Sequence, residues 1–256
     1  MEYRIHRLHE IEQAALRAFP ALEEDDLNGW LLRYANGHSR RTNSVQPIEH
    51  AGDLPGQLAK AEAWYAARGI PITFRMTPAS QPGELDAILE SKHYFRQDPT
   101  SVQTLDLNGR EFAVDERILL ADDPTEPWFD SIMGSSRYMA GRRPTLERTL
   151  LMIEPPTAFG ILWEDEKPVA TGLAVADGDL VGLYSISTRP EQRRRGLGRT
   201  MSETLLEWGG RMGASTAYLQ VMHVNDAATE LYHRMGFVPV YNYWYRSPVD
   251  RPPMNG

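Results

Sequence analysis

The sequence predicts an α/β (α+β) protein in which helices flank a mixed central sheet, built as two similar halves. Segments rich in β-branched and aromatic residues alternate with segments of helical periodicity along the whole chain. Turn and cap residues separate most of these segments. In addition, Leu89–Phe95 can be laid against Leu231–Phe237, and each segment closes a helix and precedes a strand. We therefore expect an internal repeat.

The composition is that of a chain that can bury a core. Of its 256 residues, 41% are hydrophobic and 24% are charged, and no run of about 18 apolar residues could span a bilayer. The N-terminus lacks the apolar core of a signal peptide, and the absence of cysteine excludes disulfides, thiolate nucleophiles and cysteine-ligated zinc. We expect a cytoplasmic monomer or homodimer with no membrane partner. The net charge of −8 disfavours nucleic acid as a partner.

The first half, residues 1–109, is predicted to begin with a strand at Tyr3–Leu8 and a helix at Glu10–Phe19. Asn36-Gly37 is a hairpin turn signal, Gly69 is a typical helix stop, and Pro82 suits a first helical position. The expected elements that follow are hairpin strands at Trp30–Tyr34 and Arg41–Val45, helices at Leu54–Arg68 and from Pro82 to about Lys92, and strands at Ile70–Met76 and within Phe95–Leu107.

The second half, residues 110–246, shows clearer signals. Apolar residues recur at helical spacing from Leu197 to Met212, and Asn225 and Gly236 suit the caps of a further helix. Residues 247–256 are polar and proline-rich and are predicted to form a flexible tail. The expected elements are strands at Val114–Leu120, Ala158–Glu164, Pro168–Ala176, Leu180–Thr188, Thr216–Met222 and Val238–Tyr245, and helices at Pro127–Tyr138, Thr145–Ile153 and about Gly198–Met212.

A basic loop with two glycines joins a strand to a helix within Ile186–Gly198. The N-terminus of a helix presents unpaired N–H groups and partial positive charge, which suit a pyrophosphate, and glycine lets the backbone approach it closely. The loop is no Walker A motif, because Gly198 is followed by Arg199-Thr200, and no dinucleotide fingerprint, because Met201 stands where a third glycine is needed. The arginines alone are also compatible with a solvated basic turn.

Two motifs identify a resemblance. Arg193–Gly198 resembles motif A of the GNAT N-acetyltransferase superfamily, Gln/Arg-x-x-Gly-x-Gly/Ala, in the same strand–loop–helix setting. Asn225–Phe237 resembles motif B, Asn-x-x-Ala-x-x-Leu-Tyr-x-x-x-Gly-Phe, at the expected distance. The resemblance covers about Val114–Tyr245. The first half resembles a degenerate copy, since it has no basic Gly-x-Gly loop and has Glu90 where the tyrosine would be. A GNAT-like acyl-CoA N-acyltransferase fold with a catalytic domain at residues 110–246 is implied.

The resemblance also implies the reaction and its residues. An amine would attack acetyl-CoA, a co-substrate, directly and with no metal, and a bulge would splay the motif A strand from its neighbour to admit the pantetheine. Tyr232 would be catalytic by protonating the departing thiolate; it could instead be a core aromatic. Asn225 could contact the cofactor, cap its helix or do both. The implied cofactor-binding residues are Ile186, Ser187, Thr188, Arg193, Arg194, Arg195, Gly196, Leu197, Gly198 and Asn225.

Several points stay open at this level. Tyr184, Ser185, Ser187 and Glu164 are candidates for the general base, as is an ordered water. The expected partner is a small-molecule or peptide amine, and the negative net charge would suit a cationic one. The expected function is N-acetyl transfer to a primary amine; the alternative is a non-catalytic acyl-CoA-binding or sensing module.

Overall fold

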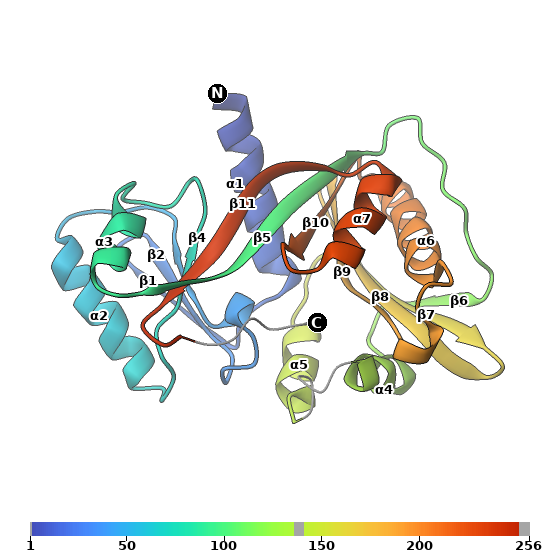
Figure 1. Ribbon diagram of the computed structural model, residues 1–256, viewed down its shortest axis with the longest axis horizontal. Coiled ribbons are helices and arrows are strands. Elements are labelled where there is room, and N and C mark those ends of the chain that lie inside the picture. The colour runs from blue at the N-terminus through green and yellow to red at the C-terminus, as the bar shows by residue number, and fades with distance from the viewer. Residues whose placement is uncertain (1, 136–140, 251–256) are drawn as a thin grey trace.

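One mixed sheet of eleven strands runs through the described part of the chain (Figure 1). The computed structural model describes residues 2–135 and 141–250. The strand order is β1-β2-β3-β4-β11-β5-β10-β9-β8-β7-β6, and neighbours are antiparallel except for the parallel pairs β3–β4 and β9–β10. The strands are β1 (Glu23–Leu27), β2 (Trp30–Tyr34), β3 (Val45–Pro47), β4 (Phe74–Met76), β5 (Phe95–Asp106), β6 (Ile118–Ala121), β7 (Thr157–Glu164), β8 (Lys167–Asp177), β9 (Leu180–Thr188), β10 (Thr216–Met222) and β11 (Val238–Ser247).

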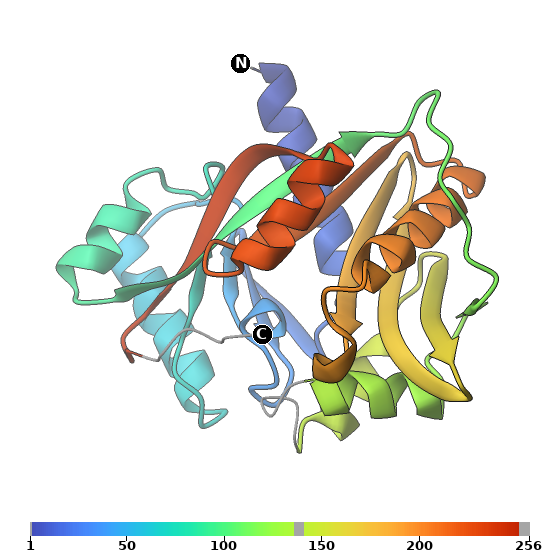
Figure 2. The same cartoon turned by 45° about the vertical axis from the view of Figure 1, so that its right-hand side comes forward.

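Helices cover both faces of the sheet, which confirms the predicted fold class. Alternate side chains of β9 point to opposite faces: Val181 packs with α6 and α7, and Leu180 packs with α1, α4 and α5. Figure 2 shows α6 and α7 in front of the sheet and α1 behind it. No helix in the described residues is long and apolar enough to cross a membrane. The helices are α1 (Glu2–Ala18), α2 (Leu54–Ala66), α3 (Leu85–Ser91), α4 (Glu126–Ser135), α5 (Arg143–Leu150), α6 (Leu197–Arg211) and α7 (Asp226–Met235), with 3-10 turns η1 (Arg40–Thr42) and η3 (Pro190–Gln192).

The two predicted halves interlock at the centre of the sheet. β5 belongs to residues 1–109 but lies between β10 and β11 of residues 110–246. β11 in turn lies between β5 and β4. Figure 1 shows these two long strands side by side across the molecule. Sheet pairing therefore crosses the predicted division at residues 109 and 110, and the two-domain description stays a prediction.

The segments of the proposed repeat occupy related places. Each helix, α3 and α7, is followed within two residues by one with positive φ, His93 at 63° and Gly236 at 94°, and then by a long strand. These two strands, β5 and β11, are the antiparallel neighbours at the centre. The predicted flexible tail begins at Ser247, the last residue of β11, and residues 251–256 lie outside the described part of the chain.

Two predictions in the first half are wrong. Tyr3–Leu8 is the beginning of α1, because Leu8, the last residue expected in the strand, joins Ile11 and Ala15 in one buried helical stripe. Arg41–Val45 forms η1 and only the start of β3. There, Oδ1 of Asn43 accepts hydrogen bonds from the peptide N–H groups of Ala35 (2.7 Å) and Gly37 (2.9 Å), so a side chain occupies the place of a pairing strand.

Candidate functional site

β9 carries a bulge where the cofactor-binding segment was predicted. Thr171 of β8 faces Ser187, whereas Leu173 faces Tyr184, so two residues of β9 stand opposite one residue of β8. Ser185, within the bulge, has a φ of 51°. A bulge of this kind bends its strand and increases its twist, and this is the distortion that the resemblance implies.

β9 and β10 separate next to this bulge. Their parallel pairing ends at Leu183↔Leu219, although both strands continue. From Ser185 to Thr188 the side chains of β9 are half-buried. The β10-facing edge of this segment has no strand partner in the described residues, so its backbone N–H and C=O groups are available to another extended chain.

The loop after β9 turns sharply into α6. Arg194 has a φ of 65°, and Gly196, the N-cap residue, has a φ of 81° and no side-chain cap. No acceptor in the described residues binds the peptide N–H groups from Arg194 to Arg199. Together with the dipole of the 15-residue α6, these donors favour an anion at this place.

The two glycines of the loop have different surroundings. A Cβ at Gly196 would have no heavy atom within 4 Å, so its positive φ is the reason for glycine there. A Cβ at Gly198 would lie 3.5 Å from Leu231, 3.9 Å from Thr188 and 4.0 Å from Ile186. These are ordinary contact distances, and they show that the loop, the end of β9 and α7 meet at Gly198, so the two motifs lie together.

The arginines of the loop are not equivalent. Arg195 forms an ion pair with Glu164 (2.7 Å) and a hydrogen bond with Gln192. In the described residues the side chain of Arg193 donates only to the carbonyl of Thr188 (3.4 Å), and the side chain of Arg194 has no partner. Both side chains are exposed. Arg193 and Arg194 are therefore the guanidinium groups best placed to meet a phosphate.

Tyr232 is a core aromatic whose hydroxyl keeps its proton. Its side chain is 8% exposed and packs edge to face on Phe237, with ring centroids 5.6 Å apart. Its hydroxyl bonds to Ser202 of α6, and Ser202 Oγ donates to the carbonyl oxygen of Gly198 (2.8 Å). Burial raises the pKa of Tyr232 to about 12, with the Ser202 bond acting in the opposite direction. The phenol keeps its proton at neutral pH.

Asn225 caps α7 as expected. Its Oδ1 accepts the peptide N–H of Ala228 (3.2 Å), and its side chain is exposed. The amide nitrogen is left for other contacts, so a role in cofactor binding stays compatible with the cap.

The structure narrows the candidates for the general base. The hydroxyl of Tyr184 lies 2.5 Å from that of Tyr218, and burial raises the pKa of Tyr184 above its ordinary value, which disfavours the anion that a base requires. Hydrogen bonds from Arg195 and the charge of Arg117 lower the pKa of Glu164, which makes it a weak base. Ser185, Ser187 and an ordered water stay as candidates.

Sequence reasoning missed a polar cluster on the α1 face of the sheet. Gln220 Oε1 accepts from Arg41 Nη2 (3.2 Å) and from the Tyr243 hydroxyl (3.1 Å), and Gln220 directly follows the last residue of β10 that pairs with β9. Nearby, Glu12 pairs with Arg75 and accepts from a tyrosine hydroxyl of β11. A glutamine inside the apolar strand Thr216–Met222 was the only sequence signal for this cluster.

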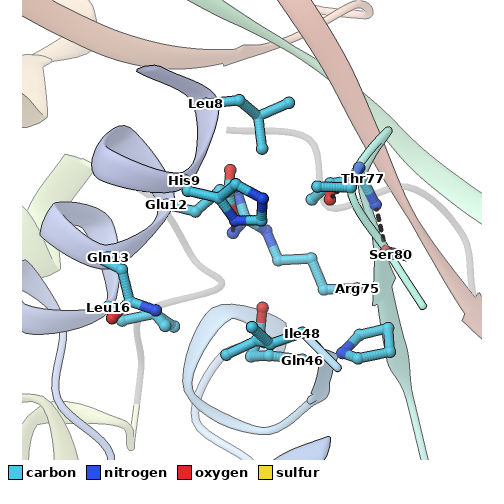
Figure 3. Close-up of a pocket in the computed structure, with 12 residues that line it drawn as sticks. Leu8, His9, Glu12, Gln13, Leu16, Gln46, Ile48, Arg75, Thr77 and Ser80 are labelled. Carbon is cyan, nitrogen blue, oxygen red and sulfur yellow. Dashed lines mark hydrogen bonds and ion pairs between the residues drawn. The ribbon is translucent and has the colours of Figure 1, made fainter. Parts of the chain in front are cut away.

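A shallow hollow borders this cluster. It has a volume of about 380 Å³, partly open to solvent, and lies between α1 and strands β3 and β4. Figure 3 shows His9 and Glu12 of α1 on one side and Arg75 of β4 on another. None of the residues predicted to bind the cofactor lines it.

The residues after the bulge fit acetyl-CoA. An unpaired strand edge suits the amides of pantetheine, unpaired N–H groups suit the diphosphate, and two exposed arginines without carboxylate partners add positive charge. In the described residues, no three His, Asp or Glu side chains gather as potential metal ligands.

Comparisons with known proteins agree with this geometry. A family model described as "Probable histone acetyltransferase Rv0428c C-terminal" matches residues 6–246. The "Uncharacterized N-acetyltransferase YobR" of Bacillus subtilis (strain 168) is 28% identical over 244 residues, which cover 93% of this chain and 98% of the relative. A GCN5-related N-acetyltransferase from Kribbella flavida has a similar fold, with a TM-score of 0.68 at 15% identity and coverage of 94% of this chain and 95% of that one. A tandem GNAT protein from the clavulanic acid biosynthesis pathway matches with a TM-score of 0.61 at 14% identity, covering 82% of this chain and 76% of that one.

Proposed function

This chain belongs to the Rv0428c C-terminal acetyltransferase family, within the GNAT superfamily of acyltransferases, and we propose that it transfers the acetyl group of acetyl-CoA to a primary amine by direct attack. The observation that carries the proposal is the separation of β9 from β10 beside the uncapped N-terminus of α6. A thioester held between the strands and a diphosphate held at the helix would use both features.

The backbone performs most of the binding in this proposal. Peptide N–H groups from Arg194 to Arg199 would hold the diphosphate, and the guanidinium groups of Arg193 and Arg194 would offset its charge. The open edge of β9 from Ser185 to Thr188 would bond to the pantetheine amides as a neighbouring strand does. An N–H of the same edge could also stabilise the thioester oxygen as it gains negative charge.

Acetyl-CoA supplies the activated acyl group, and the chain's residues handle the protons. The attacking amine must lose a proton, which Ser185, Ser187 or an ordered water would receive. Tyr232 would return a proton to the departing thiolate, because its phenol stays protonated at neutral pH.

A thiol-release assay with acetyl-CoA and a panel of primary amines tests the proposal. We expect release of CoA only when an amine is present, with a matching N-acetylated product in the mass spectrum. Binding of acetyl-CoA without turnover of any amine would contradict it and favour the acyl-CoA-sensing alternative.

A further inference from the structure

Arg41 joins the first half of the chain to the point where β9 and β10 separate. Its Nη2 donates to Gln220 Oε1 (3.2 Å), and its guanidinium carbon lies 5.5 Å from the ring centroid of Tyr184. Tyr184 and Gln220 are the residues that directly follow the last pair between these strands. The guanidinium also lies over the ring of Phe19 at 4.9 Å. One arginine of the first half therefore contacts both strands at their separation.

The charge of Arg41 has no partner in the described residues. Its neighbour Arg40 pairs with Asp98, and Arg75 pairs with Glu12, but no carboxylate of the described chain forms an ion pair with Arg41. A half-buried guanidinium normally has such a partner, because removing a charge from water costs free energy. The two aromatic rings fix its plane and supply cation–π stabilisation, but they leave most of its N–H donors unused.

A second unused donor lies beside it. The Oε1 atom of Gln220 has two donors, whereas its Nε2 is buried and has no hydrogen-bond partner in the described residues. A buried N–H group without an acceptor costs free energy unless a ligand satisfies it. Arg41 and Gln220 thus offer N–H donors at one place, and the nearby carboxylate of Glu12 is already paired with Arg75.

Arg41 and Gln220 lie on one particular face of the sheet. Tyr184 and Gln220 lie on the α1 face of the sheet, opposite the face that α6 and α7 cover. If the diphosphate lies at the α6 N-terminus, an acceptor that reaches the thioester from the α1 face would pass Arg41.

We propose that the acceptor amine carries an anionic group, a carboxylate or a phosphate, which Arg41 binds with help from Gln220. This inference rests on the proposed function and names its substrate class. It assigns the first half a direct part in choosing the acceptor, and it opposes the expectation of a cationic amine from the net charge of −8. Local donors decide, because they contact the ligand, whereas the charge of the remaining surface is screened beyond about 10 Å.

Matched acceptors test this inference. Each ω-amino acid from glycine to 6-aminohexanoate is compared with its own amide, and phosphoethanolamine is compared with ethanolamine. The two kinds of pair distinguish a carboxylate from a phosphate, and the series of amino acids varies the distance between the anionic group and the amine. For at least one pair we expect kcat/KM of the wild-type protein to favour the anionic member by about 10- to 100-fold, the range for a hydrogen bond to a charged group.

Variants locate the preference. In Arg41→Gln we expect the ratio of kcat/KM between the anionic and the neutral acceptor to fall close to one, mainly through KM. The Kd of acetyl-CoA should be unchanged. Arg41→Lys should keep part of the preference for the anionic acceptor. Arg68→Gln is the matched control, because Arg68 also lies over two rings, of Trp64 and Tyr34, but pairs with Glu23 in the first half. Arg68→Gln should keep the wild-type ratio.

Three results would overturn the inference. Equal turnover of both members of every pair would contradict the inference but leave the proposed function intact. The same holds if Arg41→Gln keeps the wild-type ratio of kcat/KM between anionic and neutral acceptors. If acetyl-CoA binds but no amine of either kind is acetylated, the proposed function fails and this inference fails with it. The wild-type ratios need no variant, so a poorly folded Arg41→Gln does not remove the test.

Discussion

Replacing Tyr232 by phenylalanine separates a catalytic tyrosine from a structural one. The change removes the hydroxyl that bonds to Ser202 and keeps the buried ring that packs on Phe237. No donor is orphaned, because Ser202 Oγ still donates to Gly198. Unfolding by urea should therefore show a loss of only about 1 kcal/mol, the ordinary value of one hydrogen bond.

The effect on turnover should be much larger than this. A general acid contributes about 100- to 10,000-fold, whereas 1 kcal/mol amounts to about fivefold. We therefore expect the kcat of Tyr232→Phe to fall at least about 100-fold in the thiol-release assay, with a change of less than about twofold in the Kd of acetyl-CoA by calorimetry.

Ser202→Ala is the matched control for this experiment. It removes the same hydrogen bond from the other side and keeps the phenol proton. Its kcat should stay within about fivefold of wild type. The reasoning is refuted if both variants lose turnover equally, or if Tyr232→Phe loses acetyl-CoA affinity as much as turnover, because Tyr232 would then act only by packing.

Three further predictions follow from single features. Gly196→Val should weaken acetyl-CoA binding at least about tenfold through backbone strain at a φ of 81° and not through a clash, since an added Cβ has no heavy atom of the described chain within 4 Å. Asparagine tolerates this conformation, so Gly196→Asn should bind acetyl-CoA better than the valine variant, and equal affinities would contradict the placement. Calorimetric titration should give one acetyl-CoA per chain, and a second site would contradict the expectation that the first half binds none. Asp86→Asn should reduce stability at pH 7 by about 1.5–3 kcal/mol, because Asp86 accepts from Arg246 (2.9 Å) and Trp244 (2.7 Å). Burial raises the pKa of Asp86, but these hydrogen bonds outweigh it and lower the pKa. The stabilisation from Asp86 is therefore present above the ordinary carboxyl range and is lost as the pH falls below about 4. In urea unfolding, the difference in stability between Asp86→Asn and wild type should be smaller at pH 3 than at pH 7.

The second half of the chain was predictable because its local signals agree. The strand predicted at Thr216–Met222 is β10, and the cap predicted at Asn225 forms in the structure. Signals conflict at the N-terminus, where a short run resembling a strand gives way to the longer helical stripe of α1. The bulge at Ser185 came from the resemblance alone, since a run of β-branched and aromatic residues does not reveal where a strand gains a residue.

The sequence could not reveal which strands pair when they lie far apart in the chain. This strand pairing positions the residues that we propose to bind the acceptor. Nothing local in Phe95–Asp106 indicates that β5 lies between β10 and β11, because strand order depends on contacts far apart in the chain. Yet this order places β4 next to β11 and β5 next to β10, and η1 of the first half reaches the α1 face of β10, where Arg41 contacts Gln220. A one-residue slip of β5 against β10 would turn the side chains of β5 to the opposite face and disrupt both cores, so the register of β5 is strongly specified. The first half can therefore lack a phosphate loop of its own and still hold an arginine in a fixed position at the point where β9 and β10 part.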